Sequence, residues 1–316
     1  MNTIDLSGAW RWETDEKDEG IAQEWYKRTL RHEGFRLRGS TCENGIGKKQ
    51  EYYAELTKGA ARAPREKYEY IGALWLQREL DVPQKLAGKS VRLFLERVNI
   101  ASQLWLDGAQ IGRQIIELSA PHCYELTKQL TPGAHTLTLR IDNRNLLNCG
   151  TMASGYSIDT QGYWNGAVGR IELQYEERFH VEQVQGSPQE DGIRVKLTFA
   201  SDIWKTNDRY HTETELTVIR PDGTPLAARK FGRVMFNSRQ VEYFDYAMDD
   251  IQHWDEFTPN LYTLSVKAMS KDNADEKTVS FGMRRIQTEG KKILLNGRQI
   301  ALRGTIDCAQ YPLTGY

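Results

Sequence analysis

The clearest pattern along this chain is the recurrence of apolar residues at every second position. Val91, Leu93 and Leu95 lie two residues apart, and residues 137–141 and 171–173 repeat the pattern. Such alternation is typical of β-strands that bury one face and expose the other. It therefore predicts strands with one buried face at these three places.

Turn signals separate the predicted strands. Asp107-Gly108 readily adopts the positive φ angles of a tight hairpin turn, and the Thr-Pro-Gly of residues 131–133 stops the chain before the next strand. Helical periodicity is scarce, and we expect at most a short helix over residues 21–30. Because no helix alternates with the strands, the pattern does not fit a parallel sheet with crossover helices.

A second series of strand-like segments begins near residue 178. Turns such as Pro221-Asp222-Gly223 separate them, and together they extend over about 100 residues, which is typical of an immunoglobulin-like sandwich. This stretch contains no cysteine, so a sandwich with a disulfide between its sheets is excluded. The segments read RFHVEQV, GIRVKLTFA, TETELTVIR, RQVEYFDYAM and LYTLSVKAM.

The N-terminal part has longer connections, notably residues 38–70 and 145–165. Loops of this length in a compact β domain are usually functional or disordered. They fit a jelly roll with long loops at one end better than a second small sandwich. We therefore expect an all-β chain with a jelly roll followed by an immunoglobulin-like sandwich.

Composition and charge narrow the possible partners. Of the 316 residues, 39% are hydrophobic, and 42 Lys+Arg nearly balance 43 Asp+Glu, so no overall field favours nucleic acid. The chain lacks a run of about 18 apolar residues, and its N-terminus lacks the layout of a signal peptide. We expect no nucleic acid and no membrane as partners. The 8 Trp and 15 Tyr favour stacking on flat ligands, sugar faces included.

Cysteine and histidine spacing gives no sign of a metal or cofactor site. The four cysteines form no CxxC pair and have no histidine at ligand spacing, so we expect mostly free thiols and no metal or cofactor. The six histidines are far apart, and we expect them to be surface or capping residues. Triad chemistry with a serine or cysteine nucleophile has no support in the sequence.

Six motifs occur along the chain in a fixed order. Four fall in the first domain: IDLSGAWRW, GALWLQRELDVP, VRLFLERVNIASQLWLDGAQIGR and YWNGAVGRIEL. Two more, HWDEFTPNLYTLSV and FGMRRIQTEGKKILLNGRQIALRG, fall in the second domain and at its end. In their order and spacing these motifs resemble the N-terminal domains of family 2 glycoside hydrolases, which include β-galactosidases and β-glucuronidases. The resemblance covers essentially the whole chain.

The resemblance implies a domain plan and a substrate class. Residues 1–177 would form a sugar-binding jelly roll, residues 178–284 the sandwich, and residues 285–316 a linker with the first strand of a (β/α)₈ barrel. Such a barrel needs about 250 residues. The two catalytic carboxylates of a retaining glycosidase would come from that barrel, so we expect no catalytic residue in this chain. The implied substrate is a β-linked carbohydrate.

The family also implies where a sugar would bind. In the loop that precedes the last jelly-roll strand, Asp159 would accept hydrogen bonds from sugar hydroxyls, and Tyr163 and Trp164 would stack on the sugar ring. The alternative is that Asp159 starts a turn and Trp164 covers the sandwich. Near the C-terminus, Arg303 would contact the substrate or tie the first barrel strand to the sandwich, and Asp307 would be an acceptor.

Two departures qualify the resemblance. Where the family usually has a His-Glu pair, this chain has Cys308-Ala309, which puts galactosidase or glucuronidase specificity in doubt. The glycine-rich residues 39–49 lack the spacing of a phosphate-binding loop, and we expect a flexible loop there or the rim of the sugar site.

Two other classes of function stay open at this point. A stand-alone carbohydrate-binding protein would use the same aromatic loops, whereas a structural or adhesive protein with two sandwiches would bind no sugar. A homo-oligomer is possible, because exposed sheet edges serve both monomers and dimers. The resemblance indicates a periplasmic or secreted protein. The N-terminus, which lacks the layout of a signal peptide, indicates the cytoplasm instead.

Overall fold

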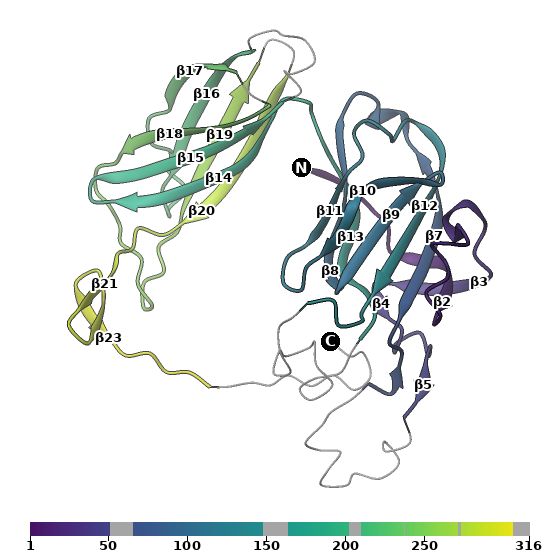
Figure 1. Cartoon of the computed structure of the whole chain (residues 1–316). Helices are drawn as coiled ribbons and strands as arrows, with labels where there is room; N and C mark the ends of the chain where they lie inside the picture. Colours follow the sequence, from purple (N-terminus) through teal and green to yellow (C-terminus); the bar gives the residue numbers. More distant parts are fainter. Residues whose placement is uncertain (51–65, 148–163, 202–209, 237, 271–272, 306–316) are drawn as a thin grey trace. The chain divides into compact units, whose positions relative to one another are not determined.

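The computed structural model describes residues 1–50, 66–147, 164–201, 210–236, 238–270 and 273–305. Within these ranges the regular structure consists of β-strands and two short 3₁₀ turns, which confirms the predicted all-β class (Figure 1). No helix in the described ranges is long and apolar enough to span a membrane. The chain divides into two compact units, one running from Met1 to Glu176 and one beginning at Glu177.

The first unit is a sandwich of two antiparallel sheets. The five-stranded sheet has the order β1-β13-β8-β11, with β4 also paired to β13, and the six-stranded sheet has the order β10-β9-β12-β7-β2-β3. The first sheet comprises β1 (Asn2–Asp5), β4 (Gly39–Ser40), β8 (Ser90–Asn99), β11 (His122–Glu125) and β13 (Gly166–Glu176). The second comprises β2 (Gly8–Asp15), β3 (His32–Leu37), β7 (Ala73–Val82), β9 (Ala101–Leu106), β10 (Ala109–Ile116) and β12 (Gly133–Asp142). A two-stranded ribbon pairs β5 (Lys48–Lys49) with β6 (Tyr68–Glu69).

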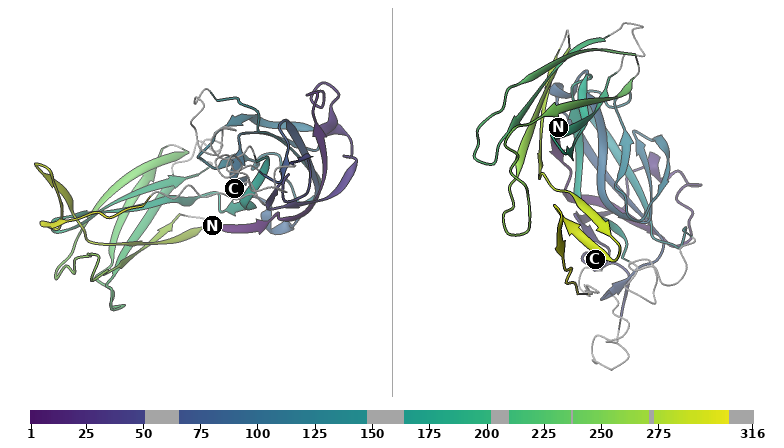
Figure 2. Two further views of the ribbon diagram at one scale, coloured as in Figure 1. Left: turned by 90° about the horizontal axis from the view of Figure 1, so that it is seen from below. Right: turned by 90° about the vertical axis from the view of Figure 1, so that its left-hand side faces the viewer.

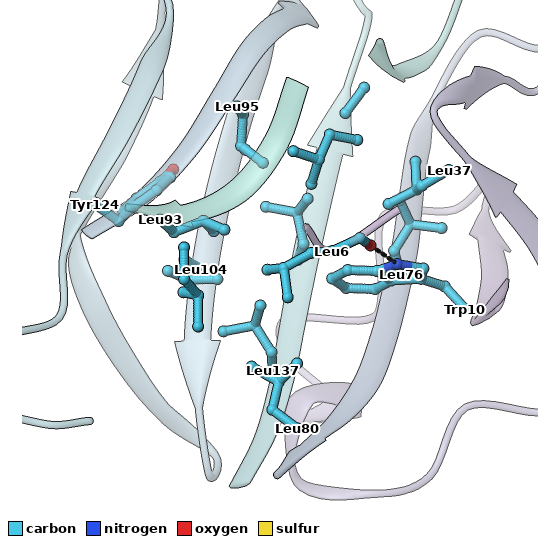
Figure 3. Packing of buried hydrophobic residues seen from close by; sticks show 14 of the residues in the cluster. Leu6, Trp10, Leu37, Leu76, Leu80, Leu93, Leu95, Leu104, Tyr124 and Leu137 are labelled. Carbon is cyan, nitrogen blue, oxygen red and sulfur yellow. Dashed lines mark hydrogen bonds between the residues drawn. The ribbon is translucent and has the colours of Figure 1, made fainter. Parts of the chain in front are cut away.

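The apolar alternation read from the sequence forms the core between these sheets. Leu93 and Leu95 of β8 point toward Leu104 of β9 and Leu137 of β12, and none of the four is exposed to solvent (Figure 3). Burying a leucine side chain contributes about 1.5–3 kcal/mol of transfer free energy. The prediction of strands with one buried face is therefore confirmed.

The predicted short helix over residues 21–30 is wrong. Only a 3₁₀ turn, η1 (Trp25–Lys27), forms there, after Glu24 in the left-handed region with φ 52°. A second 3₁₀ turn, η4 (Gln84–Leu86), lies between β7 and β8. The indole of Trp25 lies against Trp75 with ring centroids 6.0 Å apart, and Tyr26 stacks on Trp105 at 5.0 Å. This aromatic packing on the outer side of the six-stranded sheet outweighs the local helical preference.

The second unit is a sandwich of three and four strands. Its sheets have the orders β14-β15-β18 and β17-β16-β19-β20, which is the division expected of an immunoglobulin-like fold. Its own core is separate from that of the first unit. The strands are β14 (His180–Gln189), β15 (Gly192–Ala200), β16 (Tyr210–Ile219), β17 (Arg229–Met235), β18 (Arg239–Ala247), β19 (Tyr262–Met269) and β20 (Ala274–Phe281).

A small three-stranded sheet follows the sandwich. It contains β21 (Ile286–Glu289), β22 (Lys292–Leu295) and β23 (Arg298–Ile300), and Figure 2 shows it in yellow as a sheet of its own. Asn296-Gly297, a dipeptide that favours a tight hairpin turn, joins β22 to β23 with φ angles of 51° and 82°. Residues 301–305 have no regular secondary structure, so the expected barrel strand is not confirmed.

Candidate functional site

The two longest connections of the first unit leave the sandwich at the same end. In the strand register, Ala73 at the start of β7 lies opposite Asp142 at the end of β12, and Gly166 at the start of β13 lies opposite Asn99 at the end of β8. The described residues directly before Ala73 and Gly166 therefore lie at the same end of the sandwich. We call this the loop end of the jelly roll, and it lies at the side of the unit that carries β4 and β5 in Figure 1.

Buried asparagines tie the two connections together. The Oδ1 of Asn143 accepts a hydrogen bond from the backbone N–H of Gly72 at 2.9 Å, and its Nδ2 donates to the carbonyl of Tyr70 at 2.9 Å. Asn165 donates to the carbonyl of Gly72 at 2.8 Å and to Oδ1 of Asn143 at 3.2 Å. Both asparagines are completely buried. They satisfy backbone groups that a buried loop would otherwise leave unpaired.

A third asparagine extends this arrangement to β8. Asn99 donates from Nδ2 to the carbonyl of Trp164 at 2.8 Å, and the backbone N–H of Thr41 donates to the carbonyl of Asn165 at 2.8 Å. We call Asn99, Asn143 and Asn165 the asparagine cluster. It fixes the last residues of the loop that ends at Gly166 against both β8 and the turn after β4.

A group of paired charges lies beside the cluster. Arg140 donates to Asp142 at 2.9 Å and to Asp18 at 2.6 Å, and Arg144 also reaches Asp18, at 2.8 Å. Burial disfavours ionisation of Asp142, but hydrogen bonds from Arg144 and the charges of both arginines outweigh it and lower the pKa of this carboxyl. Asp142 therefore stays ionised and anchors both arginines at the end of β12.

The structure describes two of the five residues predicted to bind sugar. Trp164 lies at the loop end and is buried, with 6% of its surface exposed, and the guanidinium carbon of Arg97 is 5.6 Å from its ring centroid. Arg303 is exposed in the segment after β23, which belongs to the other unit. Asp159, Tyr163 and Asp307 lie outside the described residues. The sugar-binding roles of all five stay predictions.

Residues 41–46 form a packed turn rather than the flexible loop that their glycine content indicated. The backbone N–H of Ser40 donates to Glu43 at 2.9 Å, and Asn44 donates from Nδ2 to the carbonyl of Ser40 at 2.8 Å. Cys42 and Ile46 are buried below them. This turn therefore belongs to the rigid base of the loop end.

His122 contradicts the expectation that every histidine is a surface or capping residue. Its side chain on β11 is completely buried, with Nδ1 2.6 Å from Oγ of Ser102 and Nε2 3.2 Å from the carbonyl of Glu117. The hydroxyl of Tyr124 lies 2.7 Å from the same Oγ. Burial lowers the pKa of His122 and keeps its imidazole neutral.

Cys42 and Cys123, the two cysteines in the described ranges, are free thiols as expected. Burial raises the pKa of both, so neither is an activated nucleophile. In the part of the chain that the structure describes, no three His, Cys, Asp or Glu side chains come together as a metal site.

Comparison with known proteins supports the resemblance carried by the sequence motifs. Residues 179–284, which form the sandwich, match the family model described as glycosyl hydrolases family 2. This chain therefore resembles the N-terminal part of a family 2 glycoside hydrolase, as the motifs indicated.

Relatives and solved structures extend the similarity to both units of this chain. It is 24% identical over 245 residues to the β-galactosidase large subunit of Latilactobacillus sakei, covering 74% of this chain and 36% of that protein. It is 21% identical to a β-glucuronidase of Paenibacillus borealis, covering 95% of this chain and 48% of the relative. The crystal structure of a Bacteroides uniformis β-glucuronidase superposes with a TM-score of 0.71 at 17% identity, over 96% of this chain and 35% of that one. The chain thus spans between a third and a half of the length of these proteins.

Proposed function

We propose that this chain is the non-catalytic N-terminal part of a family 2 glycosidase that hydrolyses a β-linked carbohydrate, resembling a β-galactosidase. The observation that carries the proposal is the loop end of the jelly roll. There, completely buried asparagines hold the described ends of two long connections next to each other on the sandwich. Proteins commonly place binding loops in this way on a rigid scaffold.

The proposed role of each domain follows from the part of the longer relatives that this chain matches. The relatives named β-galactosidase and β-glucuronidase are two to three times longer than this chain, and the family resemblance places acid/base and nucleophilic carboxylates in a barrel. In the proposed enzyme, the jelly roll shapes one side of the sugar pocket. The barrel supplies two carboxylates about 5 Å apart, and the sandwich connects the two.

Within this chain, the proposed sugar contacts are those of the connection that ends at Gly166. Asp159 would accept hydrogen bonds from two neighbouring hydroxyls, and the ring of Tyr163 would stack on the apolar face of the sugar. Trp164, which is buried and bonded through its carbonyl to Asn99, would support this loop rather than lie open to the sugar. Arg303 and Asp307 would reach the substrate from the first barrel strand.

Titration calorimetry with D-galactose and D-glucuronate tests the proposal against a stand-alone carbohydrate-binding protein. A pocket that needs the barrel on its other side gives no saturable heat with the 316-residue chain at millimolar sugar. Saturable binding of either monosaccharide, abolished by Asp159→Ala, would instead show that the loop end is a complete binding site.

A further inference from the structure

A cleft lies within the second unit, between the immunoglobulin-like sandwich and the small sheet that follows it. Its volume of about 700 Å³ falls in the range of about 300–1,000 Å³ that is typical of ligand sites. The turn between β14 and β15 lines one side, and the start of β21 and the turn between β22 and β23 line the other. Among the residues that line this cleft, which we call the arginine cleft, are Gln189, Glu190, His253, Arg284, Arg285 and Gln287.

One asparagine fixes the side of the cleft that carries the arginines. The backbone N–H of Arg285 donates to Oδ1 of Asn296 at 2.8 Å, and the backbone N–H of Asn296 donates to the carbonyl of Arg285 at 2.8 Å. Nδ2 of Asn296 donates to the carbonyl of Trp254 at 3.0 Å. The N–H of Trp254 in turn donates to the carbonyl of Met283 at 3.0 Å. These bonds hold the backbone in place before any ligand arrives, which lowers the cost of binding.

Uncharged groups hold both guanidinium groups of the cleft. The guanidinium carbon of Arg284 lies 5.0 Å from the ring centroid of Trp254. With its amide oxygen turned toward Arg285, Gln287 accepts hydrogen bonds from Nε and Nη2 of that arginine at 3.1 and 3.0 Å. Both arginines are exposed to solvent. Each is thus oriented by a neighbour that leaves its charge uncompensated.

Neither arginine forms an ion pair in the part of the chain that the structure describes. Arg298 on β23, by contrast, contacts Glu256 at 2.5 Å. The described lining contains one carboxylate, that of Glu190, against two guanidinium groups. With His253 counted as neutral, the arginine cleft therefore carries a net positive charge, which favours an anionic ligand.

The chemistry of these groups narrows the choice of anion. A guanidinium binds a carboxylate or a phosphate through two parallel hydrogen bonds. The cleft of about 700 Å³ has room for much more than a small free ion, since one water molecule takes up about 30 Å³. The amide of Gln189 both donates and accepts, as sugar hydroxyls require. These features favour a carboxylate carried on a sugar.

We propose that the arginine cleft binds a uronate-containing oligosaccharide, with Arg284 and Arg285 bonded to a carboxylate and the neighbouring amides bonded to hydroxyls. The site would hold the glycosidase on an acidic polymeric substrate. It rests on the proposed function for the choice of a saccharide as the carrier of the carboxylate. A single uronate contacts too few of these groups to saturate the cleft at millimolar concentration, so the test uses oligomers.

Titration calorimetry of the 316-residue chain with trigalacturonate and with a hyaluronan tetrasaccharide tests this site. At least one of the two should bind saturably. Arg284→Gln or Arg285→Gln should weaken that binding by about tenfold, the equivalent of one charge-assisted hydrogen bond. Arg284→Lys keeps the charge but not the planar fork, so it should recover only part of the affinity. Neutral β-1,4-galactotriose and inorganic phosphate should bind more weakly by about tenfold or more.

Arg229→Gln is the matched control for loss of charge. Arg229 is exposed in the same unit, its guanidinium carbon lies 4.9 Å from the ring centroid of Tyr246, and it does not line the cleft. Affinity for the oligouronate should stay at the wild-type value in this variant. Thermal unfolding of every variant separates loss of binding from loss of fold.

Three results would overturn the site: no saturable binding of either oligouronate, equal affinity for inorganic phosphate, or equal weakening by Arg229→Gln and Arg284→Gln. The test is independent of the loop-end proposal, because Asp159 belongs to the other unit and Asp159→Ala should leave oligouronate binding unchanged.

Discussion

The loop end depends on residues that carry no charge. An asparagine side chain offers both a donor and an acceptor, so Asn143 can satisfy the N–H of Gly72 and the carbonyl of Tyr70 at once. A carboxylate could only accept, and an aliphatic residue of similar size would leave both backbone groups buried and unpaired. This double capacity explains why amides occupy the point where the two connections meet.

Asn143→Ala should therefore destabilise the first unit. Leaving a buried donor and a buried acceptor unpaired costs about 1–3 kcal/mol each, and we expect a loss of about 2–4 kcal/mol in the free energy of unfolding. Urea unfolding measures it, with Asn2→Ala on the exposed face of β1 as the control. A loss no larger than that of the control would show that the cluster does not hold the loop end.

The buried His122 makes the stability of the first unit depend on pH. Its folded-state pKa is lowered from the usual 6.5 by burial, so at mildly acidic pH the unfolded chain binds a proton that the native state does not. The free energy of unfolding therefore falls as the pH drops below about 6.5, and it keeps falling until the folded-state pKa is reached.

His122→Gln should remove the contribution of this histidine to the pH dependence of the free energy of unfolding. At pH 7.5 we expect a loss of about 1–3 kcal/mol in the free energy of unfolding, because the bonds to Ser102 and Glu117 are disturbed. Between pH 6.5 and 5 the variant should lose less stability than the wild type. His211→Gln, which changes an exposed histidine, should keep the wild-type slope. An unchanged slope in His122→Gln would contradict the assignment.

Such buried polar partnerships could not be predicted from the sequence. Asn143 and Gly72 are 71 residues apart, and Asn165 and Gly72 are 93 residues apart, so no local pattern links them. His122 likewise lies in a strand whose residues alternate between buried and exposed positions, and the sequence does not show which of the two faces is buried. The sequence indicated the loop that ends at Gly166, but not the side chains that hold it.

At the scale of single elements, strands with an apolar buried face and turns with glycine were the predictable features. The hairpins at Asp107-Gly108 and Asn296-Gly297 both have positive φ at the two central positions, as their sequences indicated. In the second unit, the strands β17 and β20 were missed; both are edge strands rich in charged residues, such as the Asp-Glu-Lys of β20. An edge strand needs less apolar surface, so its pattern resembles that of a loop.

Gly297→Ala tests the contribution of one such turn. A Cβ at this position would meet no heavy atom within 4 Å, so the cost is confined to the positive φ of 82° and should be about 1 kcal/mol. Hydrogen exchange of the β22 and β23 amides should accelerate accordingly. Gly304→Ala is the control, since that glycine also has open space but no positive φ. Equal exchange in both variants would argue against the strained turn.

At the scale of the whole molecule, two separate cores predict two separable units. Leu93 belongs to the first core and Leu264 to the second, and each side chain is completely buried. Leu264→Ala should cost the sandwich about 2–5 kcal/mol and leave the jelly roll unchanged, and Leu93→Ala should do the reverse. Tryptophan fluorescence and hydrogen exchange resolved by segment can follow each unit. Loss of protection in both units from one substitution would contradict separate cores.

The order of the two sandwiches and the resemblance to family 2 glycoside hydrolases could be predicted from the sequence because several motifs occur in a fixed order over the whole chain. The substrate could not be predicted from the sequence, since relatives named as β-galactosidases and β-glucuronidases are similar to this chain to nearly the same degree. Asp307-Cys308-Ala309 is the segment where this sequence departs from the pattern usual in family 2 glycoside hydrolases, and it stays the predicted place of a difference in substrate choice.

The central claim is that this chain supplies sugar-binding structure and no catalytic group. Release of nitrophenol from p-nitrophenyl β-D-galactoside, β-D-glucuronide and β-D-mannoside tests it most directly, measured for the 316-residue chain and for the longest product of the same gene. We predict no release above the buffer rate by the chain and release from at least one substrate by a product that is longer by a barrel. Turnover by the 316-residue chain alone, or a gene that ends at codon 316, would contradict the account.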